Sequence, residues 1–182
     1  NDAWKELVEG GWVTYRALNI YSEKESAYHI AVSEDSPYPR AIVVVEKASL
    51  YEPLHDIANT YQFSFCCTGG QSSRAAAMAY VAQLEELGID IAQDFTVFSF
   101  ADFDPEGWVI PEAFCQHLSL RVTGHIALVR LGVLKRQLGQ SVIKHQAIPY
   151  SLTNKTGEPS RTKITKYENF TRETGGLFLP GR

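Results

Sequence analysis

Residues 95–107 have the sequence Phe-Thr-Val-Phe-Ser-Phe-Ala-Asp-Phe-Asp-Pro-Glu-Gly, in which an apolar run ends in an acidic loop. A similar step occurs upstream, where the β-branched run of residues 41–45 is followed directly by Glu46. Runs of this kind predict buried strands of a parallel sheet. Because ligands bind at the carboxyl ends of such strands, we expect Glu46, Asp102 and Asp104 to gather at one edge of the sheet.

This set of carboxylates predicts a metal site. Acidic groups that lie close together repel one another unless a cation lies between them, and ligand sets made only of oxygen suit Mg²⁺. Mg²⁺ takes one or two protein carboxylates, so a third one is free to act as a general acid or base. A structural role stays open as well, because acids often follow strands in exposed loops, and Lys47 is an alternative partner for Glu46. Glu106 either extends the acidic pattern or faces solvent.

The rest of the chain alternates between strand-like and helix-like segments, which predicts an α/β fold with a parallel sheet of about four strands flanked by helices. We expect an N-terminal extension or the remnant of a preceding domain at 1–40, one domain at 41–135 and a basic C-terminal extension at 136–182. Strands are predicted at 41–45, 63–67, 95–100 and 126–131, and helices at 3–9, 49–60, 74–87, 109–118 and 160–174.

Length and composition are those of an ordinary globular domain. The chain has 182 residues, of which 45% are hydrophobic and 21% charged, so it can build a core. It has no apolar run of membrane-spanning length and no basic-then-apolar segment at its start, and its three cysteines predict buried thiols rather than a disulfide framework. We therefore expect no membrane association and a cytoplasmic or nucleoid-associated location. The first residue is Asn1, which indicates a processed chain or part of a longer one.

Charge is distributed unevenly along the chain. The net charge is −4, but residues 121–182 contain eleven basic and three acidic residues, a balance of +8, which leaves −12 for residues 1–120. A basic tail beside an acidic site suits an enzyme that binds a polyphosphate such as DNA. The tail residues expected on the DNA backbone are Lys155, Arg161 and Lys163. The alternative is a solvated tail that only balances charge.

Three segments, taken together and in this order, resemble the TOPRIM domain. They are Ile42-Val-Val-Val-Glu46-Lys47-Ala-Ser-Leu-Tyr, then Thr68-Gly-Gly-Gln-Ser-Ser, then Asp102-Phe-Asp104-Pro-Glu-Gly107. The resemblance covers residues 41–118 and is strongest to the version found in the topoisomerase VI A subunit, the meiotic double-strand-break proteins and related bacterial and phage proteins. Residues 129–138 weakly resemble the segment that follows in those proteins.

The resemblance implies a Rossmann-like TOPRIM fold and a Mg²⁺ site at Glu46, Asp102 and Asp104, where Mn²⁺ can substitute, with Glu46 also the candidate acid or base. The turn after residue 68 opens a helix, so its amides and hydroxyls are candidates to hold a phosphate. An ordinary N-capping turn is the alternative there. The candidate phosphate or DNA contacts in this part of the chain are Lys47, Gly70, Ser72 and Arg74.

The implied function is Mg²⁺-dependent DNA cleavage and strand passage of the type IIB topoisomerase kind, with DNA, a second copy of the chain and an ATPase subunit as partners. In that family the nucleophile is a tyrosine on a winged-helix domain that precedes the TOPRIM part. About forty residues precede Glu46 here, too few for that domain. Tyr15 is the nearest candidate for the nucleophile and resembles it only weakly. Two alternatives therefore stay open: a defence-type TOPRIM nuclease that uses water as the nucleophile, and a non-catalytic DNA-binding module.

Overall fold

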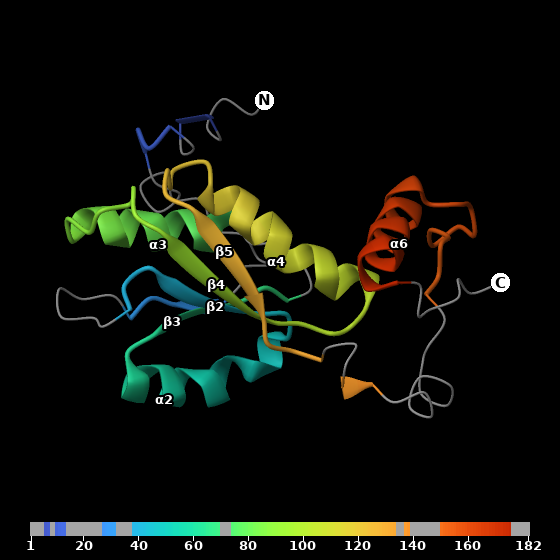
Figure 1. Ribbon diagram of the computed structural model, residues 1–182, viewed down its shortest axis with the longest axis horizontal. Helices are drawn as coiled ribbons and strands as arrows, with labels where there is room; N and C mark the ends of the chain where they lie inside the picture. Colours follow the sequence, from blue (N-terminus) through green and yellow to red (C-terminus); the bar gives the residue numbers. More distant parts are fainter. Residues whose placement is uncertain are drawn as a thin grey trace.

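The computed structural model describes residues 6–7, 10–13, 27–31, 38–69, 74–133, 137–138 and 150–175. Within these ranges the chain forms a five-stranded, mostly parallel sheet flanked by helices, so the predicted α/β class is confirmed (Figure 1). The predicted helix at 3–9 lies mostly outside the described residues. The elements are β1 (Ala27–His29), β2 (Ala41–Val45), η1 (Ala48–Leu50), α2 (Tyr51–Tyr61), β3 (Ser64–Cys67), α3 (Arg74–Glu86), β4 (Phe95–Phe100), α4 (Pro105–Leu118), β5 (Ile126–Arg130) and α6 (Arg161–Thr174).

The strands lie in the order β1-β3-β2-β4-β5. β2 pairs in parallel with both β3 and β4, and β4 pairs in parallel with β5, so the four predicted strands form one parallel unit. β1 is an addition that the sequence did not predict, and it pairs antiparallel with β3, with Ala27 opposite Cys67 and His29 opposite Phe65. The central position of β2 and β4 brings their carboxyl ends side by side.

Side chains that alternate along each strand fill two cores, one on each face of the sheet. Ile42 and Val44 of β2 pack with Phe95 and Val97 of β4 under α3 and α4, whereas Val45 faces the other way, toward α2. Figure 1 shows α3 and α4 on one face of the sheet and α2 on the opposite face. A continuous apolar strand buried on both faces is typical of parallel sheets, and this explains why β2 has no polar residue.

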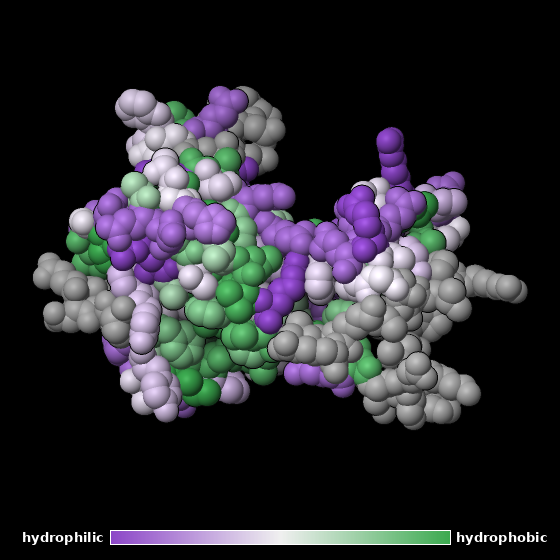
Figure 2. Space-filling model, in the orientation of Figure 1, coloured by the Kyte–Doolittle hydropathy of each residue, from purple (hydrophilic) through white to green (hydrophobic). Residues whose placement is uncertain are grey.

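α2 covers only part of its face of the sheet. Among the described residues, large apolar side chains near β4 and β5 stay exposed, and Figure 2 shows a hydrophobic area in this region beside the hydrophilic surface of α6. The exposed side chains are Phe100, Val129, Leu131 and Val133. No helix of the described residues is both long and apolar enough to cross a membrane.

The cysteines are free thiols, as the sequence predicts. Cys66 and Cys67 of β3 are buried, one on each face of the sheet, and Cys115 of α4 is half-buried. Burial raises the pKa of the Cys67 thiol and raises that of Cys115 to about 11. Cys67 and Cys115 therefore have little thiolate character at neutral pH.

α4 begins four residues earlier than the sequence prediction of residue 109. Its first residue is Pro105, and the Asp104 side chain precedes it as the N-cap, accepting a hydrogen bond from the Gly107 amide. Proline suits the first helical position because it has no amide hydrogen to satisfy there. Gly107 consequently lies in the first turn of the helix.

Candidate functional site

Glu46 and Asp102 meet at the carboxyl edge of the sheet because their strands are direct neighbours. Val45 of β2 lies opposite Phe100 of β4, and Glu46 and Asp102 follow these residues closely. The Glu46 amide donates a hydrogen bond to the Phe100 carbonyl at 3.1 Å, which extends the strand pairing by one step. The parallel register therefore fixes both backbone positions from which the two carboxylates project.

The Lys47 ammonium lies between these two carboxylates. Its Nζ is 3.0 Å from Oε1 of Glu46 and 2.7 Å from Oδ2 of Asp102. Hydrogen bonds to Asp102 and then to Glu46 raise the pKa of Lys47 above its ordinary value, although burial opposes this. Lys47 is thus the partner that the sequence offered as the alternative to a metal ion, and its single positive charge lies against both carboxylates.

The Glu46 side chain is the most enclosed acid of the site, with 10% of its surface exposed, against 53% for Asp102. Its Oε2 accepts a hydrogen bond from the Asp102 amide at 3.0 Å. Gly107 packs against both groups: a Cβ there would overlap the Asp102 carbonyl oxygen and lie 2.9 Å from Oε2 of Glu46. Glycine at this position leaves the room that allows the first turn of α4 to lie against the acidic loop.

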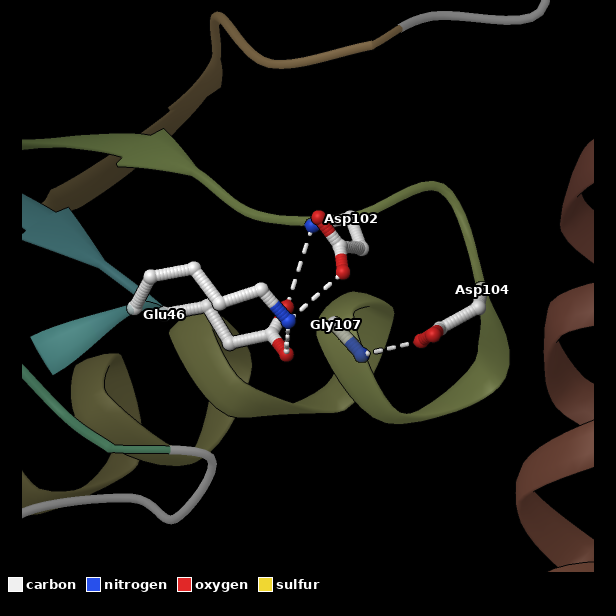
Figure 3. A network of polar contacts seen from close by, with 5 residues as sticks. Glu46, Asp102, Asp104 and Gly107 are labelled. Atoms are coloured by element: carbon white, nitrogen blue, oxygen red, sulfur yellow. Dashed lines mark hydrogen bonds and ion pairs between the residues drawn. The ribbon is translucent and has the colours of Figure 1, made fainter. Parts of the chain in front are cut away.

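Asp104 has a different arrangement from the other two acids. Its Oδ1 accepts a hydrogen bond from the Gly107 amide at 2.7 Å, and Figure 3 shows Gly107 between the side chains of Asp104 and Glu46. Burial raises the pKa of Asp104, the charges of Glu46 and Asp102 raise it further, and the Gly107 amide lowers it. In this conformation Asp104 caps a helix and does not join the other two carboxylates around Lys47.

The donor set fits a divalent cation in part. Oε1 of Glu46 and Oδ2 of Asp102 both contact one cationic atom, the Nζ of Lys47, so two carboxylate oxygens already converge on one positive centre. Two carboxylates are also what Mg²⁺ commonly takes from a protein. No group of three or more His, Cys, Asp or Glu side chains is arranged to hold a metal in the described part of the chain, so Asp104 fits only if it leaves its capping position.

Glu106 faces the C-terminal part of the chain and not the carboxylate pair. Its Oε1 accepts a hydrogen bond from the Tyr150 hydroxyl at 2.7 Å, and its Oε2 pairs with the Lys166 ammonium of α6. Burial alone would raise the pKa of Glu106, but hydrogen bonds from Lys166 and Tyr150 outweigh it and lower the pKa. The sequence left two roles open for Glu106, an extension of the acidic pattern or a side chain that faces solvent. The contact with Tyr150 and Lys166 differs from both.

Aromatic side chains hold α6 against the acidic loop. Phe103, between the two aspartates, has its ring 5.1 Å from that of Phe170 in α6 and 6.0 Å from that of Trp108 in α4. The Trp108 indole also donates a hydrogen bond to Oε2 of Glu173 at 2.6 Å. α6 therefore packs directly beside the candidate site.

Arg130 is a further cation near the Glu46 and Asp102 carboxylates, and the sequence motifs did not point to it. Its guanidinium lies 3.9 Å from the ring centre of Trp108 and pairs with Glu112 at 2.6 Å. Both Arg130 and Asp102 line a small surface hollow beside the acidic loop. The sequence offered one signal for Arg130, namely its place in the predicted strand at 126–131. In the sheet Arg130 lies opposite Ser99 of β4, the strand that leads into the acidic loop.

The predicted phosphate and DNA contacts are distributed over several elements. Gly70 and Ser72 lie outside the described residues, and Arg74 is the half-buried first residue of α3. Lys155 and Arg161 are exposed, as a DNA contact requires. Lys163 is engaged within the protein, because its ammonium donates to the Thr153 carbonyl at 2.8 Å.

Comparisons with protein-family models, with curated proteins and with solved structures gave no significant match to this chain.

Proposed function

We propose that this chain is a Mg²⁺-dependent TOPRIM domain that acts on DNA phosphodiesters, of the kind found in topoisomerase VI A-like proteins. The observation that carries the proposal is the convergence of Glu46 and Asp102 from two adjacent parallel strands. A structural ion pair alone does not require two carboxylates at the ligand-binding edge of a parallel sheet. The order of the three sequence motifs supports the same function.

In the proposed reaction Glu46 and Asp102 would hold the metal ion, and Asp104 would be a third ligand only in a conformation in which it does not cap α4. Mg²⁺, when bound, stabilises the negative charge on the phosphoryl oxygens. Glu46 is enclosed and hydrogen-bonded through Oε2, which orients its carboxylate for transfer of a proton to or from a DNA oxygen. The exposed cations Lys155 and Arg161 are proposed to contact the DNA backbone.

A metal titration followed by thermal unfolding tests this proposal. Millimolar Mg²⁺ or Mn²⁺ should raise the melting temperature of the full chain, and Asp102→Asn combined with Asp104→Asn should abolish the rise. Asp56→Asn is the control, because the Asp56 side chain is 93% exposed on α2 and should leave the rise intact. No change in the wild-type melting temperature at these concentrations would sink the proposal.

The single variants separate the roles of the two aspartates. Asp102→Asn removes a carboxylate that already faces a cation and should reduce the metal response on its own. Asparagine is as good an N-cap as aspartate, so Asp104→Asn keeps α4 capped while removing the charge. A metal response that survives Asp104→Asn would assign Asp104 to capping alone.

The contacts of Lys47 and Asp104 favour a second candidate, a non-catalytic DNA-binding module. Lys47 pairs with both carboxylates and Asp104 caps a helix, so the acids have structural partners without a metal. DNA affinity of such a module would fall steeply with salt and would be indifferent to a chelator. Incubation of supercoiled plasmid with the full-length protein distinguishes the enzymatic candidates: a topoisomerase-like product keeps protein on the DNA ends, and a nuclease leaves them free.

A further inference from the structure

The position of Lys47 has a consequence for metal binding. The same two oxygens that are placed to ligate a divalent ion, Oε1 of Glu46 and Oδ2 of Asp102, are the ones that contact its ammonium. The second oxygen of Glu46 is held by the Asp102 amide. A metal ion and the Lys47 ammonium therefore compete for the same oxygens.

The Lys47 contacts are suited to exchange. The side chains of Lys47 and Asp102 are 52% and 53% exposed, so water reaches both of them. Ion pairs between exposed side chains contribute little to stability, and a lysine on a flexible four-carbon stem can leave without rearrangement of the backbone. The enclosed Glu46 stays in place because its Oε2 is hydrogen-bonded to the backbone.

We propose that Lys47 exchanges with the divalent cation: its ammonium holds Glu46 and Asp102 together in the metal-free protein and is released when the ion enters. The inference rests on the proposed function and adds a form of regulation to it. Without metal, Lys47 keeps the two like charges from repelling each other, so the site is pre-formed. With metal, the ammonium is free at the exposed side of the site, where a phosphate oxygen of DNA can become its partner.

If Lys47 exchanges with the metal, its removal should increase the affinity for the metal. If Lys47 only supported the site, its removal would not increase that affinity. In the wild type, metal binding breaks two ion pairs, but in Lys47→Met there is nothing to displace. Lys47→Met should therefore bind Mn²⁺ about tenfold more tightly than the wild type, the effect expected from losing two partly exposed ion pairs. Lys47→Arg keeps the charge and makes stronger contacts with carboxylates, so it should bind Mn²⁺ more weakly than the wild type.

The experiment is a calorimetric titration of the full chain with Mn²⁺, repeated with Mg²⁺, on the wild type, Lys47→Met, Lys47→Arg and Arg172→Met. Arg172→Met is the matched control, because it removes one positive charge from the exposed surface of α6 and should keep the wild-type affinity. Thermal unfolding gives a second measurement: Lys47→Met should melt lower than the wild type without metal and gain more from added Mn²⁺.

The outcomes separate this inference from the function on which it rests. Equal or weaker binding by Lys47→Met, with metal still bound by the wild type, would overturn the exchange and leave the proposed function standing. Absence of binding by both proteins would overturn both. Tighter binding by Lys47→Met together with weaker binding by Lys47→Arg supports the exchange, and if Lys47→Met does not fold, the Lys47→Arg result alone decides.

Discussion

Gly107→Ala tests whether the first turn of α4 lies against the acidic loop as closely as the structure places it. The added Cβ would overlap the Asp102 carbonyl and approach Oε2 of Glu46 to 2.9 Å, and the backbone carbonyl cannot rotate away as a side chain would. Overpacking of this kind costs about 1–3 kcal/mol. Displacement of Glu46 also loses its hydrogen bond from the Asp102 amide, about 1.5 kcal/mol for a charged acceptor.

Helix propensity acts in the opposite direction. Alanine is favoured over glycine inside a helix by about 1 kcal/mol, so the net loss in the free energy of unfolding for Gly107→Ala is about 2.5 kcal/mol. For a chain of this length that corresponds to a fall of about 5–10 °C in melting temperature. Differential scanning calorimetry measures this, and the metal-induced rise should shrink in parallel because Glu46 and Asp102 are displaced.

Gly88→Ala is the matched control for Gly107→Ala. Gly88 has φ +68° and no atom within 4 Å of an added Cβ, so alanine there costs only the backbone strain of the left-handed region, about 1–2 kcal/mol. It should lower the melting temperature while leaving the metal response unchanged. If Gly107→Ala proves as stable as the wild type or more stable, overpacking costs no more than the gain in helix propensity, and the close approach of α4 to the acidic loop is wrong.

Three further predictions concern the surroundings of the acidic loop. Asp104→Ala should cost about 1 kcal/mol of stability through loss of the α4 N-cap, whereas Asp104→Asn should cost little, as urea denaturation would show. Because the pKa of Glu106 lies below its ordinary value of 4.5, its contribution to stability is complete above that pH and is lost as the pH falls through the lowered pKa. Glu106→Gln should therefore flatten the acidic limb of a plot of melting temperature against pH, and an unchanged limb would contradict this assignment. Tyr150→Phe should cost about 1 kcal/mol by removing a hydrogen bond to Glu106, while the same change at Tyr61, which is 70% exposed, should have no measurable effect.

The parallel strands could be predicted from the sequence because each has a local signature. The apolar runs at 41–45 and 95–100 match β2 and β4 residue for residue, and the rule that ligand groups follow parallel strands places Glu46 and Asp102 at one edge. β1 could not be found in this way. It has only three residues, and it exists because the exposed edge of β3 accepts an antiparallel partner from a distant part of the chain.

The role of Asp104 could not be predicted because the same residue type serves two different structural roles. A carboxylate before proline is both a candidate metal ligand and a typical helix N-cap, and the sequence Asp104-Pro105 carries the same letters in either case. The contact between Glu106 and α6 could not be predicted at all, because it joins residues sixty positions apart. The assignment of residues 136–182 as a separate extension stays a prediction, although α6 packs on α4.

Trp108 gives the protein a built-in optical probe. Its indole touches three parts of the molecule at once: the Phe103 ring of the acidic loop, the Arg130 guanidinium of β5 and the Glu173 carboxylate of α6. Trp12, the other tryptophan among the described residues, is 84% exposed. With Trp4 and Trp12 replaced by phenylalanine, the emission wavelength and lifetime of Trp108 would report in real time on the acidic loop and on the attachment of α6, without any added label.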